Sequence, residues 1–308
     1  MKISKMTFPA LAAMALAFAG CNQDENLPGG NTDERVAIRV SSNIDTESKV
    51  QKTGTRAVDN QWEQNDAIGI FMLNGTTPEK SNIAYNTTNG SAFSPMDETI
   101  YLPAEKPLER DFVAYYPHTE TLNNNAYTIS LADQTDQSAI DFMTSAKVTG
   151  VTKNKPDVDF IFQHRLAKLR LKITAQDGFN PDQSELAGLK IELTGQQTTG
   201  TYNVLTDNAV AIVQSDKTIT LNTAGNGQTA EAIVFPSENY NNMAFQFTVD
   251  GHAEPYIWNL SESTKATKFE EGREYIYNIT INRTGIDVTA TIKPWEKGNG
   301  DGETGSAE

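Results

Sequence analysis

Residues 273–294, which read REYIYNITINRTGIDVTATIKP, decide the fold class of this chain of 308 residues. Apolar and polar side chains alternate through most of the stretch, apart from Ile276. Strict alternation buries one face of a strand and leaves the other in water, as in antiparallel sandwiches. The apolar rows are Tyr275, Tyr277, Ile279 and Ile281, then Ile286, Val288, Ala290 and Ile292.

The same period of two recurs along the chain, at residues 36–41, 168–173 and 245–249. The segments between such runs carry turn residues that supply the positive φ of tight hairpins. No stretch shows sustained helical spacing, and only short pieces such as 134–142 could form a turn or two of helix. The sequence therefore predicts an all-β protein built from antiparallel β-sandwiches. The turn signals are Asn74-Gly75, Asn89-Gly90, Asp177-Gly178, Gly225-Asn226-Gly227 and Asp250-Gly251.

A composition change near residues 148–159 suggests where two domains meet. This stretch contains Gly150 and the run Lys153-Asn154-Lys155-Pro156. It divides the chain that would remain after removal of a signal peptide into two blocks of similar size. We expect an N-terminal domain over 35–155 and a C-terminal domain over 156–297. The tail, 298–308, lacks large apolar residues and is predicted to be disordered.

The first twenty residues have the features of a secretion signal. Lys2 and Lys5 precede a short apolar run, and small residues end it at Gly20, directly before Cys21, the chain's single cysteine. This ending resembles a bacterial lipobox, although Phe18 stands where that motif usually has Leu. The resemblance implies cleavage between Gly20 and Cys21 and a lipid such as palmitate on the Cys21 thiol. The alternative is a plain signal peptide with an incidental cysteine.

Residues 21–34 have no apolar periodicity and are predicted to form a flexible, acidic tether. Its first part includes Asp24 and Glu25 and resembles the signal that sends Bacteroidetes lipoproteins to the cell surface. The alternative is a simple solvated linker. Together with lipidation at Cys21, the signal would place the protein on the outer membrane, facing outwards.

Charge and residue counts argue against several classes of function. The chain has 25 basic and 40 acidic residues, a net charge of −15, which is unfavourable for nucleic-acid binding. One cysteine and three histidines leave little material for a metal or catalytic site, so we expect no enzyme activity, catalytic residues, metal or cofactor. Asp157 and Asp159 share one strand face, but on so acidic a surface we attribute their pairing to chance.

Several short motifs occur along the chain in a definite order: Thr55-Arg56-Ala57, residues 62–71 (WEQNDAIGIF), 111–117 (DFVAYYP), Asp141-Phe142-Met143, 162–169 (FQHRLAKL) and 272–295. In this order and spacing they resemble the fimbrillin (Mfa-like) family of Bacteroidetes pilus subunits and surface lipoproteins. Essentially the whole mature chain is covered. The resemblance implies two tandem transthyretin-like β-sandwich domains, in agreement with the strand pattern.

The resemblance also implies assembly by strand complementation, or donor-strand exchange. A protease cuts after an Arg in the loop behind the first strand, and a neighbouring subunit's strand fills the groove that is left. Here the first strand would be residues 35–43, and Arg56-Ala57 is the matching site. A solvated loop charge is an equally weighted interpretation of Arg56.

The functional hypothesis is a surface-anchored fimbrial subunit, or an accessory or tip adhesin, that supports adhesion. Its partners would be other fimbrial subunits, outer-membrane lipid through Cys21, and a host or bacterial surface receptor. No alternating apolar row follows 286–293, so the chain has little to donate unless that segment swings out, which favours a terminal or accessory subunit. The alternative is a surface glycan-binding lipoprotein that stacks sugars on exposed aromatic residues drawn from Trp62, Trp258, Trp295, Tyr115 and Tyr116.

Overall fold

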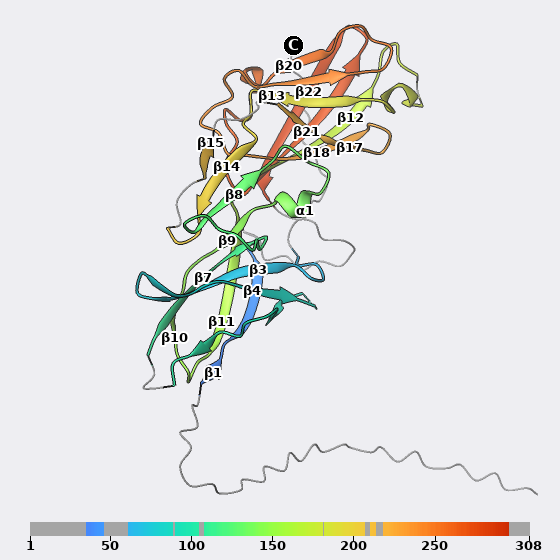
Figure 1. Ribbon diagram of the computed structural model, residues 1–308. Helices are drawn as coiled ribbons and strands as arrows, with labels where there is room; N and C mark the ends of the chain where they lie inside the picture. The colour runs from blue at the N-terminus through green and yellow to red at the C-terminus, as the bar shows by residue number, and fades with distance from the viewer. Residues whose placement is uncertain are drawn as a thin grey trace, which may run out of the picture. The chain divides into compact units, whose positions relative to one another are not determined.

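A computed structural model describes residues 35–45, 61–88, 90–104, 108–180, 182–206, 210–213 and 218–295 (Figure 1). The chain divides into residues Met1–Glu34 and a body, Arg35–Glu308. Strands dominate the described part of the body, which confirms the all-β prediction, and α1 (Gln137–Ile140) is a single turn of helix. Within the described part of the chain, no helix combines the length and the apolar character needed to span a bilayer.

The first half of the body is an eight-stranded sheet in the order β10-β7-β3-β4-β5-β2-β11-β9. An additional pairing between β7 and β9 makes the strands from β7 through β2 to β9 a closed circuit of pairings. β1 (Val36–Ala37) and β6 (Tyr101–Leu102) pair with each other in a separate two-stranded antiparallel sheet. The strands are β2 (Arg39–Ile44), β3 (Ala67–Asn74), β4 (Thr77–Thr87), β5 (Ala92–Pro95), β7 (Arg110–Tyr116), β9 (Met143–Ser145), β10 (Val148–Val151) and β11 (Asp157–His164).

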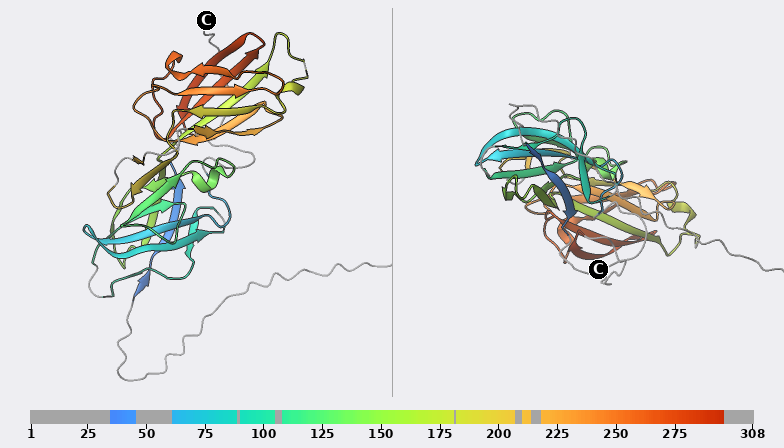
Figure 2. Two further views of the ribbon diagram at one scale, coloured as in Figure 1. Left: turned by 45° about the horizontal axis from the view of Figure 1, so that its top comes forward. Right: turned by 90° about the horizontal axis from the view of Figure 1, so that it is seen from below.

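The second half contains a five-stranded sheet, β17-β18-β12-β21-β22, and a four-stranded sheet, β16-β13-β19-β20 (Figure 2). Side chains from both sheets share one buried apolar cluster, so the two sheets form a sandwich. The strands are β12 (Ala167–Ala175), β13 (Lys190–Thr194), β16 (Thr218–Thr220), β17 (Asn222–Ala224), β18 (Thr229–Val234), β19 (Ala244–Thr248), β20 (Tyr256–Asn259), β21 (Arg273–Asn282) and β22 (Gly285–Pro294).

Residues 273–294, whose alternation predicted the fold class, form the antiparallel hairpin of β21 and β22. Tyr277 lies opposite Ala290, and Ile281 lies opposite Ile286. On its other side β21 pairs in parallel with β12, so β21 is an interior strand and β22 is an edge strand of the described sheet. The inward row of β21 is buried, whereas most of β22 is half-exposed.

A third sheet, β15-β14-β8, combines strands from both halves of the sequence: β8 (Ala126–Ser130), β14 (Thr199–Asn203) and β15 (Ala211–Val213). The strands β3 and β7 bury both faces, because one face joins the first core and the other joins the core of the second half. The second core therefore extends under strands of the first half.

The sequence predicted a domain division at residues 155 and 156, just before β11. In the structure β11 belongs to the first sheet, and sheet membership changes after it, between His164 and Ala167. The turn residues at 153–155 close a tight turn between β10 and β11, in which Thr152 bridges to Lys155. A tight turn between two strands and a domain linker use the same residue types, which is why composition placed the division there.

The alternation in β12 gives a direct test of the second core. Leu171 is fully buried, whereas its neighbour Lys172 faces solvent. We expect Leu171→Asp to lower the free energy of unfolding by several kcal/mol, because it places a charge among apolar side chains. Chemical denaturation followed by circular dichroism measures this. The matched control Lys172→Asp should stay within about 0.5 kcal/mol of the parent, and equal stability of the two variants would contradict the register of β12.

Candidate functional site

The first long strand, β2, has neighbours on both sides. It pairs in parallel with β11 over six residues, from Arg39 opposite Asp157 to Ile44 opposite Phe162, and antiparallel with β5, where Val40 lies opposite Phe93. Backbone bonds extend the ladder at both ends: Arg39 N–H donates to Pro156 O (2.9 Å) and Asp45 N–H to Phe162 O (2.7 Å). β2 is therefore hydrogen-bonded on both sides, and it joins β5 to β11 in the closed circuit of strand pairings of the first sheet.

Every second side chain along this segment enters the first core. Ile38 and Val40 are buried, and Ile44 packs against the same cluster with partial exposure. They contact a core rich in aromatic rings, in which Trp62 meets Phe93 and Phe162 edge to face at 5.2 and 5.1 Å. Removing β2 would expose these rings and leave backbone groups of β5 and β11 without a partner.

Ser42 is the one polar side chain in this inward row. Its side chain is 1% exposed, and its hydroxyl has no hydrogen-bond partner among the residues that the structure describes. A buried polar atom left in this state loses its hydration without compensation. Ser42 is therefore a weak point in the fit of β2 to its groove.

The outward face of β2 is held by polar contacts to β11. Arg39 makes a bidentate ion pair with Asp157, from Nε at 2.6 Å and Nη2 at 2.8 Å, and the Ser41 hydroxyl donates to Asp159. The hydrogen bond from Arg39 holds the pKa of Asp157 below its usual value. The pairing of Asp157 with Asp159, which the sequence analysis attributed to chance, is thus explained by the first strand that both carboxylates bind.

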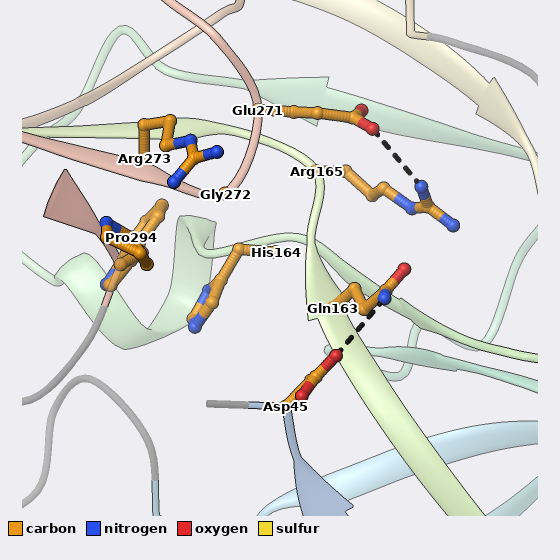
Figure 3. A pocket seen from close by; sticks show the side chains of 9 residues that line it. Asp45, Gln163, His164, Arg165, Glu271, Gly272, Arg273 and Pro294 are labelled. Atoms are coloured by element: carbon orange, nitrogen blue, oxygen red, sulfur yellow. Dashed lines mark hydrogen bonds and ion pairs between the residues drawn. The ribbon is translucent and has the colours of Figure 1, made fainter. Parts of the chain in front are cut away.

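A pocket of about 240 Å³ lies where β2 and β22 both end (Figure 3). Gln163 donates to the Asp45 carboxylate at 3.3 Å, and Arg165 lies 3.4 Å from Glu271. Arg165 also donates to the Thr144 hydroxyl at 2.6 Å. The pocket is lined by Asp45, Gln163, His164, Arg165, Glu271, Gly272, Arg273, Pro294 and Trp295.

The last described residue, Trp295, is buried in the wall of this pocket. Its ring stacks on His164 with centroids 4.0 Å apart and planes 7° apart, and its backbone N–H donates to Gly272 O at 2.8 Å. His164 is itself buried, with Nδ1 2.9 Å from the Asp141 carboxylate. This histidine therefore has a structural role, and the end of β22 is anchored to the end of β11.

The aromatic residues considered for sugar stacking lie in the protein interior. Trp258, Trp295, Tyr115 and Tyr116 are buried, and Trp62 is partly buried among other rings. The residues that the structure describes also contain no group of three His, Cys, Asp or Glu side chains placed to hold a metal ion. The candidate functional site is therefore the groove of β2, by which we mean the space that β2 fills between β5 and β11 over the first core.

The sequence matches the model of one known protein family, described as fimbrillin-like, over residues 55–295. The chain belongs to the fimbrillin-like family. This confirms the resemblance found in the sequence motifs.

The names of individual similar proteins agree with this assignment. A protein of Bacteroides uniformis named as a fimbrium subunit, Fim1C, is 42% identical over 97% of both chains. A crystal structure described as a cell adhesion protein of B. uniformis is 36% identical, with a TM-score of 0.73, and covers 87% of this chain and 100% of the other. Another, from Bacteroides ovatus, is 26% identical with a TM-score of 0.67 and covers 86% and 99%. These relatives are thus described as a fimbrium subunit and as cell adhesion proteins, and a non-enzymatic role fits this family.

Several predicted site residues of this fimbrillin-like chain, Gly20, Cys21, Asp24, Glu25, Arg56 and Ala57, lie outside the described residues. The contacts that sequence reasoning missed are those between β2 and β11. Arg39–Asp157, Ser41–Asp159 and Asp45–Gln163 are each separated by 118 residues. This constant spacing is the signature of a parallel strand pair, but nothing in either segment alone identifies its partner.

Ser42 permits a test of how tightly β2 is held. We expect Ser42→Ala to raise the free energy of unfolding by about 1 kcal/mol, because it removes a buried hydroxyl without removing a hydrogen bond. The control Ser41→Ala deletes the outward hydroxyl that binds Asp159 and should give no increase. Urea titration of the purified variants measures both, and a loss of stability in Ser42→Ala would show that its hydroxyl has a partner.

Proposed function

We propose that this protein is a surface-anchored fimbrial subunit, or an accessory or tip adhesin, that assembles by strand complementation and supports adhesion. The observation that carries the proposal is the position of β2, which is inserted between β5 and β11 and is followed by the segment that contains Arg56. Family membership and a fimbrium subunit among the relatives support the same conclusion. The proposal includes two tandem transthyretin-like domains and a lipid anchor at Cys21 in the outer membrane.

The energetics of the groove support strand exchange. A cut after Arg56 would separate residues up to Arg56 from the rest of the body, so that only non-covalent contacts hold β2. Burial of an aliphatic side chain such as Ile38 or Val40 is worth roughly 1.5–3 kcal/mol. An empty groove would combine this lost burial with unpaired backbone groups, and such a sheet edge is a template for an incoming strand.

Whether the subunit ends a fibre or extends it would depend on whether the closing strand β22 stays on β21. Lys293 lies 2.9 Å from the buried carboxylate of Glu274, and Trp295 is buried against His164. While these contacts hold β22 on β21, the chain can accept a strand and end a fibre as a terminal or accessory subunit. If β22 is released, the same strand becomes available to a neighbouring subunit, and the chain can extend a fibre.

The cleavage site can be tested with a charge-preserving change. Treatment with an Arg-specific protease should yield a body that begins at Ala57 and forms higher oligomers, and Arg56→Lys should prevent both results because it removes the Arg but keeps the positive charge. Amino-terminal sequencing and size-exclusion chromatography provide the measurements. Oligomers formed by uncut Arg56→Lys protein would contradict assembly by release of β2. A surface chain that keeps lipidated Cys21 at its amino terminus would instead favour an anchor or a glycan-binding lipoprotein.

The anchor can be tested separately in cells. We expect Cys21→Ala to abolish acyl labelling and to release the protein from the membrane fraction, because Cys21 is the single thiol available for a lipid. Replacing Asp24 and Glu25 together by Ala should leave the protein lipidated but protected from protease added to intact cells. Unchanged acyl labelling of Cys21→Ala would disprove the anchor.

A further inference from the structure

We propose that the groove of β2 selects its incoming strand by charge, and that it takes residues 287–293 of a second copy of this chain, antiparallel to β11 and thus opposite in direction to β2. The inference rests on the proposed function, because it requires that β2 can leave. It assigns the role of specificity determinants to Asp157 at one end of the groove and to Gln163 and Arg273 at the other.

The outward row of β11 gives the groove a polarity. At the start of β11, Asp157 and Asp159 bind Arg39 and Ser41 of β2. In its middle, Ile161 is 51% exposed and lies opposite Asn43. At its end, Gln163 binds Asp45. The first strand thus presents a basic group to the acidic end and a carboxylate to the other end.

Loss of β2 would give a net positive charge to the end of the groove at Gln163. Its charged residues are Asp45, Glu271, Arg165 and Arg273, which balance while Asp45 is present. A cut after Arg56 removes Asp45 with β2, and Glu271 remains beside Arg165. The Arg273 side chain has no ion pair among the residues that the structure describes, and it faces the pocket (Figure 3). A carboxylate on the incoming strand would restore the balance at this end.

Residues 287–293, taken in reverse order, match residues 39–45 in chemistry at every position. The outward side chains correspond as base to base, hydroxyl to hydroxyl, neutral polar to neutral polar and acid to acid. The inward side chains correspond as aliphatic, small and aliphatic. The pairs are Lys293 with Arg39, Ile292 with Val40, Thr291 with Ser41, Ala290 with Ser42, Thr289 with Asn43, Val288 with Ile44, and Asp287 with Asp45.

The charges at the two ends decide the direction. Insertion in the direction of β2 would place equally suitable side chains inside the groove and in its middle. It would, however, set Asp287 against Asp157 and bring Lys293 to the end that holds Arg273. Exposed charge pairs add little affinity, but like charges in contact discriminate between alternative arrangements.

The structure also indicates why the segment could leave its own sheet. Among the described strands β22 has one hydrogen-bonded neighbour, β21, whereas a strand in the groove has two, β5 and β11. In the groove, Ala290 would take the place of Ser42, whose buried hydroxyl has no partner among the described residues. These gains oppose the loss of the Trp295 and Lys293 contacts in the donor.

Direction can be read from a disulfide between the groove and a peptide. The protein is the full mature chain carrying Ile161→Cys, cut with an Arg-specific protease in the presence of a peptide of residues 285–295. Antiparallel insertion places residue 289 opposite residue 161, and insertion in the direction of β2 places residue 291 there. We therefore expect the peptide with Thr289→Cys to form the disulfide at least several-fold faster than the peptide with Thr291→Cys. A peptide with Asp287→Lys and Lys293→Asp should reverse this preference.

Two further variants test the role of the charges. Asp157→Lys should weaken capture of the unmodified peptide several-fold, whereas Asp182→Lys, an exposed carboxylate in the second sandwich, should leave capture unchanged. Thermal melting of the uncut proteins checks that both variants fold. Faster reaction of the Thr291→Cys peptide, or equal capture by both variants, would overturn the charge selection while leaving strand exchange intact. If the cut protein captures no peptide at all, the proposed function fails together with this inference.

Discussion

The pairing of β2 with β11 is the contact on which the first half of the molecule depends. Without it the circuit from β7 through β3, β4, β5 and β2 to β9 would be open between β2 and β11. The same contact aligns the inward row of β2 with the aromatic core and its outward row with the carboxylates of β11. One strand therefore closes the sheet, completes the core and binds the two carboxylates of β11, and a protein that gave up this strand would need another to replace it.

The groove is coupled to the second half of the molecule through a short connection. Arg165 and Leu166 join β11 directly to β12, and β12 in turn pairs in parallel with β21. Trp295, at the end of β22, stacks on His164, at the end of β11, with the Lys168 ammonium 5.9 Å from the Trp295 ring. β2, the strand proposed to leave, and β22, which holds the segment proposed to replace it in a second copy, thus end at one pocket. Each contacts the end of β11 there, because Asp45 binds Gln163 and Trp295 stacks on His164.

Sequence periodicity predicted the strands of this protein well and their partners poorly. The alternating rows of β12, β19, β21 and β22 all form strands with the expected inward faces. The parallel partner of β2 was missed, because pairing over 118 residues depends on how the whole chain folds and leaves no local signal. The role of Asp157 and Asp159 was missed for the same reason, since a carboxylate reveals its partner only when the opposing strand is known.

In the proposed strand exchange, the contacts that give β2 its affinity for the groove are distinct from those that would give it specificity. Its affinity comes from Ile38, Val40 and Ile44 in the core, and the buried hydroxyl of Ser42 reduces that affinity. Its specificity comes from exposed groups such as Arg39, whose ion pair with Asp157 is screened by solvent and contributes little to stability. Such a strand is bound tightly enough to complete folding, because it is part of the same chain. A cut after Arg56, as proposed, would remove that advantage. A strand with an aliphatic or small apolar residue in place of Ser42 and the same end charges would then be expected to bind the groove more strongly than β2 does.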